Sequence, residues 1–508
     1  MTLDEYLALM HVEFANNGRE FNQSDRYHTL KGYRKVFTDR PNELIIALND
    51  LRYDENDEPY FGIPNGMFPD PERCNRFIGE YWDSGHGFFM WGCQNYDELQ
   101  EYVKTKSYKL SSWVRHNLPA VASADFHRSS AHLYRFRQVD TLPEGTHYLY
   151  PIPVWGSILY WMDMTMEMGV HLPERVVRDA RMGRCKILLH EVFEGHGQNL
   201  NGVHNLIAAT IRYNNIPKES IGFMDANYYT PHLQNMYGTK GFYYPYWEYH
   251  IGTTTTVDPN DTPERRLQHD AIAEHIRHLE AGTVTADHTF ICLNRRTRPH
   301  RTYTTLKIHN DWDSSKFLWS YTDTYIGVLR SQCRMPETRL LDLGIMGTDY
   351  ANMMPKLIDY SGEVNDTFLH VGLQYSAYIN LVTETMFEEP DTAFLTEKIF
   401  KPIMACQPFI LEGPMGSLQH LRDYFGYKTF APYIDESYDL VGNPAERLQT
   451  IFREVERILA FTPDEMAEFM RNIAPICIYN YNKMRERIAD EVELVKLTNE
   501  IYGWVHGI

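Results

Sequence analysis

The stretch ILLHEVFEGHG, residues 187–197, decides the fold class of this chain. Its first seven residues, Ile187 to Phe193, are mostly apolar and predict a buried strand, which leads into a glycine-rich turn. The pattern then predicts a helix at about residues 202–213 and a second strand at 221–224. A strand, a helix and a strand within roughly 40 residues predict a βαβ unit of a parallel sheet.

A second alternating block extends from Thr289 to Phe430. Apolar runs and helical periodicity predict strands and helices in alternation along it. The predicted strands are 290–293, 317–321, 378–383, 408–411 and 428–430, and the predicted helices are 299–307, 349–358, 396–405 and 416–425. We therefore expect an α/β chain with two doubly wound, Rossmann-like domains.

Less regular segments flank these two blocks. Residues 1–145 are rich in aromatic residues and are broken by Gly, Pro and Asp clusters such as 60–71, so the sequence assigns no fold to them. Residues from 443 onward predict helices, and TPDE at 462–465 is a capping box with proline at the first helical position. The predicted domains are residues 146–285 and 286–508, the second with a helical C-terminal tail.

Composition excludes several classes of protein. The 508 residues are 43% hydrophobic and 23% charged, which excludes bulk disorder. Lys and Arg number 49 against 68 Asp and Glu, and the net charge of −19 disfavours general binding to DNA. Seven scattered cysteines without a C-x-x-C pair predict neither a disulfide framework nor a zinc site, and they favour a reducing compartment.

The sequence gives no sign of membrane insertion. The N-terminal residues 1–13 carry acidic side chains and no apolar core, so no secretory signal is predicted. The longest apolar stretch, 148–162, is too short to span a bilayer and contains two prolines. We expect a soluble, cytoplasmic protein of a bacterium or a phage-infected cell, without a membrane partner.

The densest chemical signal is FLTEKIF, residues 394–400. Thr396 predicts a helix cap, and Glu397 and Lys398 stand in the first turn while the apolar residues form a buried stripe. Free N–H groups at a helix start beside an ammonium group can bind a diphosphate, and Glu397 can hold ribose hydroxyls. An ordinary cap, with Glu397 complementing the helix dipole, is the alternative.

A second signal is FICLNRRTRPHR, residues 290–301, where a predicted strand leads into an arginine-rich loop. Four arginines lie within seven positions of an otherwise acidic chain. They are Arg295, Arg296, Arg298 and Arg301. Because guanidinium groups bind phosphate oxygens in a bidentate manner, this loop predicts an anion site. A solvated basic turn paired with surface acids is the alternative.

These motifs together resemble a known family. LVTET at 381–385, FLTEKIF, QPFILEG at 407–413 and YFGYKTF at 424–430 look like the donor half of GT-B glycosyltransferases. The nearest pattern is that of the alpha-1,3-fucosyltransferases, and the run 290–439 also resembles uncharacterised phage and bacterial glycosyltransferases. The resemblance implies a GT-B-like fold with an N-terminal acceptor domain, which can include residues 1–145, and a C-terminal donor domain.

The resemblance also implies roles for individual residues of a donor site. By motif match, Glu397 grips the ribose and Lys398 the diphosphate of a nucleotide sugar, while Glu384 lies near the sugar or the ribose. The phosphate-binding arginine falls in the segment 295–301 and matches Arg301 best. The predicted donor-binding set is Asn294, Arg295, Arg298, Arg301, Glu384, Thr396, Glu397 and Lys398.

Two departures from the family pattern leave the donor open. CQP at 406–408 replaces the family's small residues, and the loop before Thr396 is acidic, with Glu388, Glu389 and Asp391. GDP-fucose, a UDP-sugar and other nucleotide sugars therefore all stay candidates. Neither the sugar nor the stereochemical outcome follows from the sequence.

The acceptor side needs a carboxylate that removes a proton from the attacking hydroxyl. HEVFEGHG at 190–197 ends a predicted strand and offers Glu191 and Glu194, of which Glu194 resembles the family's base. Asp225, after the strand 221–224, is the second candidate. A carboxylate that only caps the following helix is the alternative for either residue.

Two further features have plainer interpretations. The triplet DWD at 311–313 resembles an Asp-x-Asp metal clamp, but it follows a predicted helix and not a strand, so a solvated turn is favoured and no metal ion is assigned. The aromatic run GFYYPYWEYH at 241–250 can stack sugar rings or bases, but aromatic residues more often fill cores and interfaces.

The sequence thus predicts an enzyme that moves a sugar from a nucleotide-diphosphate donor to a hydroxyl acceptor, a glycan or another molecule. We expect an inverting transfer without an obligatory cofactor or metal ion. One alternative is a phage enzyme that glycosylates a hydroxymethylated base in DNA, which the net charge disfavours. Another is a catalytically silent module that binds a sugar or a nucleotide.

Overall fold

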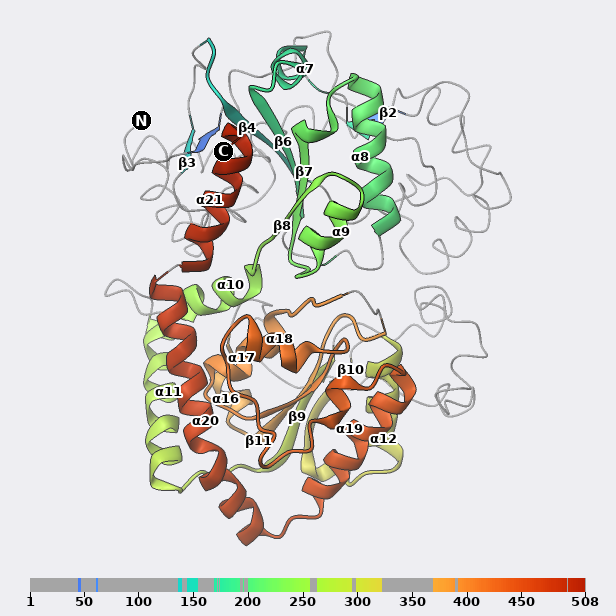
Figure 1. Ribbon diagram of the computed structural model, residues 1–508. Helices are drawn as coiled ribbons and strands as arrows, with labels where there is room; N and C mark the ends of the chain where they lie inside the picture. Colours follow the sequence, from blue (N-terminus) through green and yellow to red (C-terminus); the bar gives the residue numbers. More distant parts are fainter. Residues whose placement is uncertain are drawn as a thin grey trace. The chain divides into compact units, whose positions relative to one another are not determined.

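The apolar runs predicted as strands pair in two parallel sheets, which the computed structural model shows in two units (Figure 1). Unit 1 comprises Met1–Gly79, Phe89–Tyr246 and Glu491–Ile508, and unit 2 comprises Glu80–Phe88 and Trp247–Asp490. The structure describes residues 44–46, 61–62, 136–138, 144–153, 169–170, 172, 174–191, 195, 200–255, 263–294, 298–321, 369–388, 392–490 and 492–507.

Unit 1 contains a six-stranded parallel sheet in the order β3-β1-β4-β6-β7-β8. Its strands are β1 (Leu44–Ile46), β3 (Phe136–Gln138), β4 (Tyr148–Pro153), β6 (Cys185–Glu191), β7 (Ile221–Asp225) and β8 (Lys240–Tyr243). A separate antiparallel pair joins β2 (Phe61–Gly62) and β5 (Gly169–Val170). The central strands β6 and β7 are apolar and buried, as strands of a parallel sheet covered on both faces must be.

Helices cover both faces of this sheet. The helices of unit 1 are α7 (Glu174–Arg181), α8 (Leu200–Asn214), α9 (Thr230–Met236) and α21 (Val492–His506), with a 3-10 turn, η3 (Lys218–Ser220). A Cβ on Gly222 would lie 3.0 Å from the ring of Trp504 in α21, whereas one on Gly241 would lie 2.4 Å from the Thr230 carbonyl oxygen at α9. Because Phe223 pairs with Gly241, these two glycines face opposite sides, and so do α21 and α9.

Unit 2 contains a four-stranded parallel sheet in the order β10-β9-β11-β12. Its strands are β9 (His288–Asn294), β10 (Phe317–Tyr321), β11 (Ala377–Thr383) and β12 (Phe409–Glu412). From β9 the chain passes through a helix to β10 on one side, and from β11 it passes through a helix to β12 on the other. The strand order therefore reverses between β9 and β11, and this is where such sheets bind ligands, at the strands' carboxyl ends.

The helices of unit 2 pack around this sheet and against one another (Figure 1). They are α10 (Tyr246–Thr255), whose first residue belongs to unit 1, α11 (Pro263–Ala281), α12 (Pro299–Asn310), α16 (Val371–Gln374), α17 (Glu397–Met404), α18 (Ser417–Asp423), α19 (Pro444–Leu459) and α20 (Pro463–Asp490). Two 3-10 turns, η4 (Ser314–Lys316) and η5 (Ser437–Leu440), complete the described elements. The long helix α20 contacts both α11 and α17.

The predicted α/β class is confirmed, because both units contain parallel sheets with helices, an arrangement compatible with two Rossmann-like domains. The predicted strand at 221–224 and helix at 202–213 correspond to β7 and α8, and the predicted elements of unit 2 correspond to β9, α12, β10, β11, α17, β12 and α18. The capping box also forms, with the Thr462 N–H 2.8 Å from Glu465 Oε2. The predicted helix at 349–358 lies outside the described residues.

Among the described strands of four or more residues, β4 and β8 were not predicted. β4 contains Pro151 and Pro153, which lack the N–H that a strand needs. Among the described residues, the pairing of β1 with β4 is at Ile46 and Leu149, ahead of both prolines. β8 escapes prediction because a glycine and a lysine interrupt its short apolar run.

The predicted strand at 428–430 is wrong. The side-chain amide of Asn480 in α20 accepts a hydrogen bond from Lys428 N at 2.8 Å and donates one to Lys428 O at 2.8 Å. A side chain therefore satisfies the backbone groups that a neighbouring strand would otherwise bind.

The unit boundary also differs from the predicted division at residues 285 and 286. It falls between Tyr246 and Trp247, and the last helix, α21, belongs to unit 1. The helix α11 belongs to unit 2 because it packs against α20.

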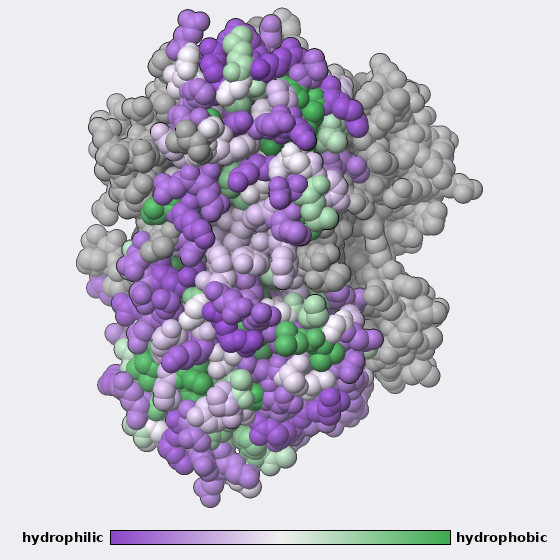
Figure 2. Space-filling model, viewed as in Figure 1, coloured by the Kyte–Doolittle hydropathy of each residue, from purple (hydrophilic) through white to green (hydrophobic). Residues whose placement is uncertain are grey.

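Hydrophilic residues predominate on the face shown in Figure 2, and hydrophobic residues form small separate patches there. Within the described part of the chain, no helix combines the length and the apolarity needed to cross a bilayer.

Candidate functional site

The carboxyl ends of β9 and β11 are joined by buried side chains at the point where the strand order reverses. Asn294, the last residue of β9, accepts a hydrogen bond from Thr383 Oγ1 at 2.6 Å. Arg301, in the first turn of α12, donates from Nη2 to the Thr383 carbonyl oxygen at 3.0 Å. Both residues come from the arginine-rich segment that the sequence predicts as an anion site, which thus lies directly beside the end of β11.

His300 makes a third connection between the two segments. Its Nε2 lies 2.9 Å from the carbonyl oxygen of Glu384. Burial, together with the positive charge of Arg301, lowers the pKa of His300 well below its usual value, so the ring is neutral. A neutral ring that bonds a carbonyl through Nε2 carries its proton there and donates it.

Glu384 joins the end of β11 to the start of α17. Its carboxylate is fully buried and accepts hydrogen bonds from Thr396 Oγ1 at 2.6 Å and from Thr396 N at 3.1 Å. Burial raises the pKa of Glu384, while the Lys398 ammonium and the Thr396 bonds oppose that shift. Because Thr396 bonds both of its oxygens, Glu384 positions the helix start, and its predicted place near the sugar or the ribose stays a prediction.

The start of α17 carries the predicted Thr-Glu-Lys motif. Thr396 caps the helix by accepting a hydrogen bond from Lys398 N, and Lys398 Nζ lies 2.7 Å from Glu397 Oε1 and 3.1 Å from Thr396 Oγ1. Burial alone would raise the pKa of Glu397, but Lys398 and Lys401 bring it below its usual value, so this carboxylate is ionised. The Lys398 side chain is 27% exposed, so part of it is accessible from solvent.

Arg301 brings the two predicted motifs into one electrostatic environment. Burial and the neighbouring Arg298 lower the pKa of Arg301 to about 10, while Glu384 and Glu397 act in the opposite direction. The cations of the segment 298–301 therefore lie close to the carboxylates of the segment 384–397. Two stretches almost 100 residues apart in sequence thus form one site of mixed charge.

Sequence reasoning missed Arg447 in α19. This side chain is 2% exposed, and it donates from Nη1 to Val441 O at 2.7 Å and from Nη2 to Phe387 O. Its guanidinium carbon lies 4.4 Å from the centre of the Phe387 ring, which also stacks with His300 at 4.9 Å. Arg447 therefore holds the segment after β11. Its place on the buried stripe of an amphipathic helix is a sequence signal for the burial of Arg447, but not for its contact with Phe387.

The start of α18 is occupied by a carboxylate of the chain itself. Asp439 in η5 accepts hydrogen bonds from Leu418 N at 2.8 Å and from Gln419 N at 2.9 Å. A carboxylate at this position satisfies the helix terminus that an anionic ligand would otherwise bind. An anionic ligand is therefore not expected at the start of α18.

The predicted acceptor-side residues are only partly described. Glu194 lies outside the described residues, and so does Arg295 of the donor set. Asp225 is 1% exposed, and its Oδ1 accepts hydrogen bonds from Asn227 N at 3.0 Å and from Thr230 Oγ1. Asp225 thus organises the turn after β7, and its predicted catalytic role stays a prediction.

The DWD triplet forms local contacts of a turn. Asp311 pairs with Lys307 at 2.6 Å, and Asp313 accepts hydrogen bonds from the N–H and the hydroxyl group of Ser315. Among the described residues, no cluster of three or more His, Cys, Asp or Glu side chains suits a metal ion. The two aspartates thus have the roles of a solvated turn.

The aromatic run at 241–250 mainly fills the interior. Tyr244, Tyr246 and Tyr249 are at most 4% exposed. Tyr243, by contrast, is partly exposed and contacts Tyr228 at the end of β7. The interpretation of the run as a core segment therefore holds for most of its tyrosines.

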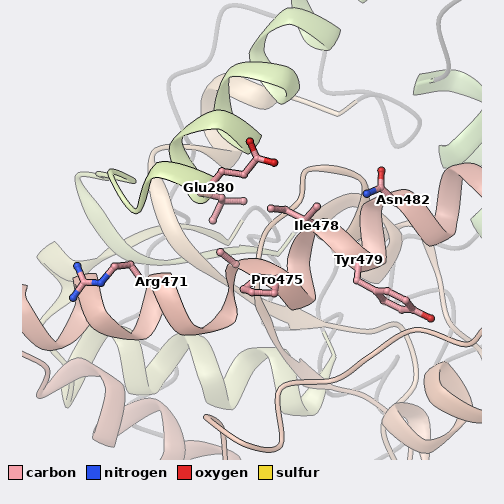
Figure 3. A pocket seen from close by; sticks show the side chains of 8 residues that line it. Glu280, Arg471, Pro475, Ile478, Tyr479 and Asn482 are labelled. Carbon is pink, nitrogen blue, oxygen red and sulfur yellow. The ribbon is translucent and has the colours of Figure 1, made fainter.

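A shallow groove lies elsewhere in unit 2, between the end of α11 and the middle of α20 (Figure 3). It is lined by Leu279, Glu280, Arg471, Ala474, Pro475, Ile478, Tyr479 and Asn482. None of these residues belongs to the predicted donor or acceptor sets. The groove and the site at the β9 and β11 ends are therefore separate features.

Glu412, the last residue of β12, makes the stability of the protein depend on pH. Its carboxyl is fully buried, and Thr304 Oγ1 lies 2.7 and 2.9 Å from the two oxygens. Burial raises its pKa to about 8, although the Thr304 hydrogen bond and the Arg301 charge oppose the shift. The folded protein thus retains this proton in a pH range where the unfolded chain, with a pKa near 4.3, has lost it.

We expect Glu412→Gln to remove this dependence. The stability that the protonated group contributes is complete below about pH 4.3 and is lost as the pH rises towards 8. The variant should therefore raise the free energy of unfolding by roughly 4 kcal/mol at pH 8 and by only about 1 kcal/mol at pH 5. Urea unfolding at both pH values measures this, with the exposed Glu468→Gln as control, and an equal change at both values would contradict it.

Comparisons of the chain with family models, curated proteins and solved structures found no match. A function can therefore be proposed from the chemistry of the site alone.

Proposed function

We propose that this protein is a nucleotide-sugar-dependent glycosyltransferase with a GT-B-like architecture. Unit 2 binds the diphosphate donor, and unit 1 presents the hydroxyl acceptor. The observation that carries the proposal is the meeting of the arginine-rich segment and the Thr-Glu-Lys motif at the point where the strand order of a parallel sheet reverses.

The charges at this point suit a diphosphate leaving group. Lys398 supplies positive charge in the first turn of α17, and Arg301, with Arg298 near it, supplies more beside Glu384 and Glu397. Negative charge grows on the diphosphate as the bond to the sugar breaks, so fixed cations lower the barrier. Three cations meet this need in the proposed mechanism without calling on a metal ion.

The two carboxylates of the donor site have different tasks in the proposal. Glu397 is ionised and can accept hydrogen bonds from the ribose hydroxyls. Glu384 keeps Thr396 and the helix start in place. The acceptor hydroxyl loses its proton to a carboxylate of unit 1, for which Glu194 is the first candidate and Asp225 the second.

A thermal-shift panel of UDP, GDP, ADP and CMP tests the donor site. A ligand that binds only the folded state raises the apparent stability by RT ln(1 + [L]/Kd), about 2.7 kcal/mol at a concentration one hundred times Kd. We expect one nucleoside diphosphate to raise the melting temperature of the wild type and to lose this effect in Glu397→Gln. Arg471→Ala, in the separate groove, is the matched control. No shift with any of the four nucleotides would contradict the proposal.

Slow hydrolysis of the donor separates an enzyme from a silent binding module. A protein that only binds the nucleotide leaves the sugar attached, whereas a glycosyltransferase releases it slowly to water. We expect release of free sugar from the nucleotide sugar whose diphosphate gives the largest thermal shift.

A further inference from the structure

Three tyrosines, Tyr228, Tyr229 and Tyr243, lie at or just beyond the carboxyl ends of β7 and β8 in unit 1. The helix α9 packs beside these two strands (Figure 1). Tyr228 is 39% exposed and Tyr229 is 37% exposed. The Tyr228 ring meets Tyr229 at 5.6 Å with an interplanar angle of 65°, and it meets Tyr243 at 5.5 Å and 89°. We call these three residues the tyrosine corner of unit 1.

Buried polar groups fix the position of this corner. Asp225 Oδ1 accepts a hydrogen bond from Asn227 N, and Asn227 Oδ1 accepts one from Tyr229 N at 3.2 Å. Tyr244 N donates to Asp225 O at 2.9 Å, which ties the end of β8 to the end of β7. Asp225 and Asn227 are both buried, so the backbone that bears the tyrosines is held before any ligand arrives.

The segment between Asp225 and Lys240 contains no acidic or basic residue apart from one histidine. The segment ANYYTPHLQNMYGT, residues 226–239, contains no Asp, Glu, Lys or Arg, although these types make up 23% of the whole chain. Its exposed side chains are aromatic, amide, imidazole, proline and thioether groups. The exposed side chains of this segment offer ring faces and neutral hydrogen-bonding groups, and none of them supplies a counter-charge for a phosphate or a carboxylate.

We propose that the tyrosine corner binds a neutral saccharide, which is the acceptor of the transfer. This inference rests on the proposed function and narrows its acceptor to an uncharged glycan. The C–H faces of a pyranose ring are apolar and pack on aromatic rings, while its hydroxyls bond to amide and phenol groups. The carboxyl end of a strand in an open parallel sheet is also where ligands of α/β proteins bind.

Saturation-transfer difference NMR tests the corner on the full chain without a donor. The probes are cellohexaose, maltohexaose, laminarihexaose, chitohexaose and N-acetyllactosamine, with a short DNA duplex as the charged probe. We expect at least one neutral saccharide to bind, with its ring C–H protons receiving most of the saturation. The double variant Tyr228→Ala, Tyr229→Ala should weaken this binding about tenfold or more, because two stacking rings are lost.

Two further variants keep the test independent of folding. Tyr228→Phe retains the ring and should retain most of the binding, and Tyr213→Ala removes a tyrosine of α8 that is 37% exposed and lies outside the corner. Binding that is equal in the double variant and the wild type would overturn the inference. The same holds if no saccharide of the panel binds, or if the duplex binds in their place.

The outcome is separable from that for the donor site. The nucleotide thermal shift is measured on the same double variant, and it depends on residues of unit 2. A retained nucleotide shift without saccharide binding would overturn the acceptor assignment alone. If no nucleotide raised the melting temperature of the wild type, the proposed function would be overturned, whether or not a saccharide binds.

Discussion

Lys398→Ala is expected to lower the turnover of the nucleotide sugar about 10²- to 10³-fold while leaving the protein folded. The loss follows from the removal of a preorganised cation at the point where charge grows on the leaving diphosphate, and groups of this kind contribute on this scale. The Lys398 side chain is partly exposed, and its ammonium donates hydrogen bonds to Glu397 and Thr396 and a longer one to Thr385. Initial-rate measurements at saturating donor give the turnover, and a melting curve gives the stability.

Lys401→Ala is the matched control for this variant. Lys401 lies one turn further along α17 and also influences the pKa of Glu397, but it stands outside the predicted motif. We expect this control to retain most of the turnover. If Lys398→Ala kept full turnover, or if both variants lost it equally, the motif would have no direct part in the chemistry.

Local patterns account for what could be predicted of the fold. Some elements can be predicted from about ten neighbouring residues, by an apolar run or by a cap such as Thr396. They are the strands β6, β7, β9 and β11 and the helices α17 and α20. β4 shows the limit of this reasoning, because it forms a strand although it contains two prolines. The stretch 428–430 shows it as well, since a side chain of α20 replaces the expected neighbouring strand.

The candidate site also has parts that the sequence predicts and parts that it does not. The arginine-rich loop and the Thr-Glu-Lys motif were predictable because each is a compact run of chemically matched residues at a strand end or a helix start. The buried role of Glu384, the cap that Asp439 gives α18 and the anchoring of Phe387 by Arg447 were not predictable. Each joins residues that only the folded sheet brings together, and no periodicity in the sequence encodes such a pair.

A buried ion pair outside the site shows the same long-range organisation. Glu248 in α10 is fully buried and receives hydrogen bonds from Arg487 Nε at 2.7 Å, from Arg487 Nη2 at 3.1 Å and from Tyr427 Oη at 2.6 Å. Burial alone would lower the pKa of Arg487, but Glu248 raises it above its usual value. The same guanidinium lies 5.1 Å from the centre of the Phe425 ring. The cluster thus fastens α10 and the 424–427 segment to the long helix α20.

Arg487→Met should lower the free energy of unfolding by about 3 to 5 kcal/mol, because it leaves the Glu248 carboxylate buried without its cation. Adding Glu248→Gln removes the uncompensated charge, so the double variant should recover a large part of this loss. Urea unfolding of the full chain measures both, and Arg485→Met, an exposed arginine on the same helix, should change the free energy by less than about 0.5 kcal/mol. A loss as small as that of the control, or a double variant less stable than Arg487→Met alone, would show that the bidentate pair does not hold these segments together.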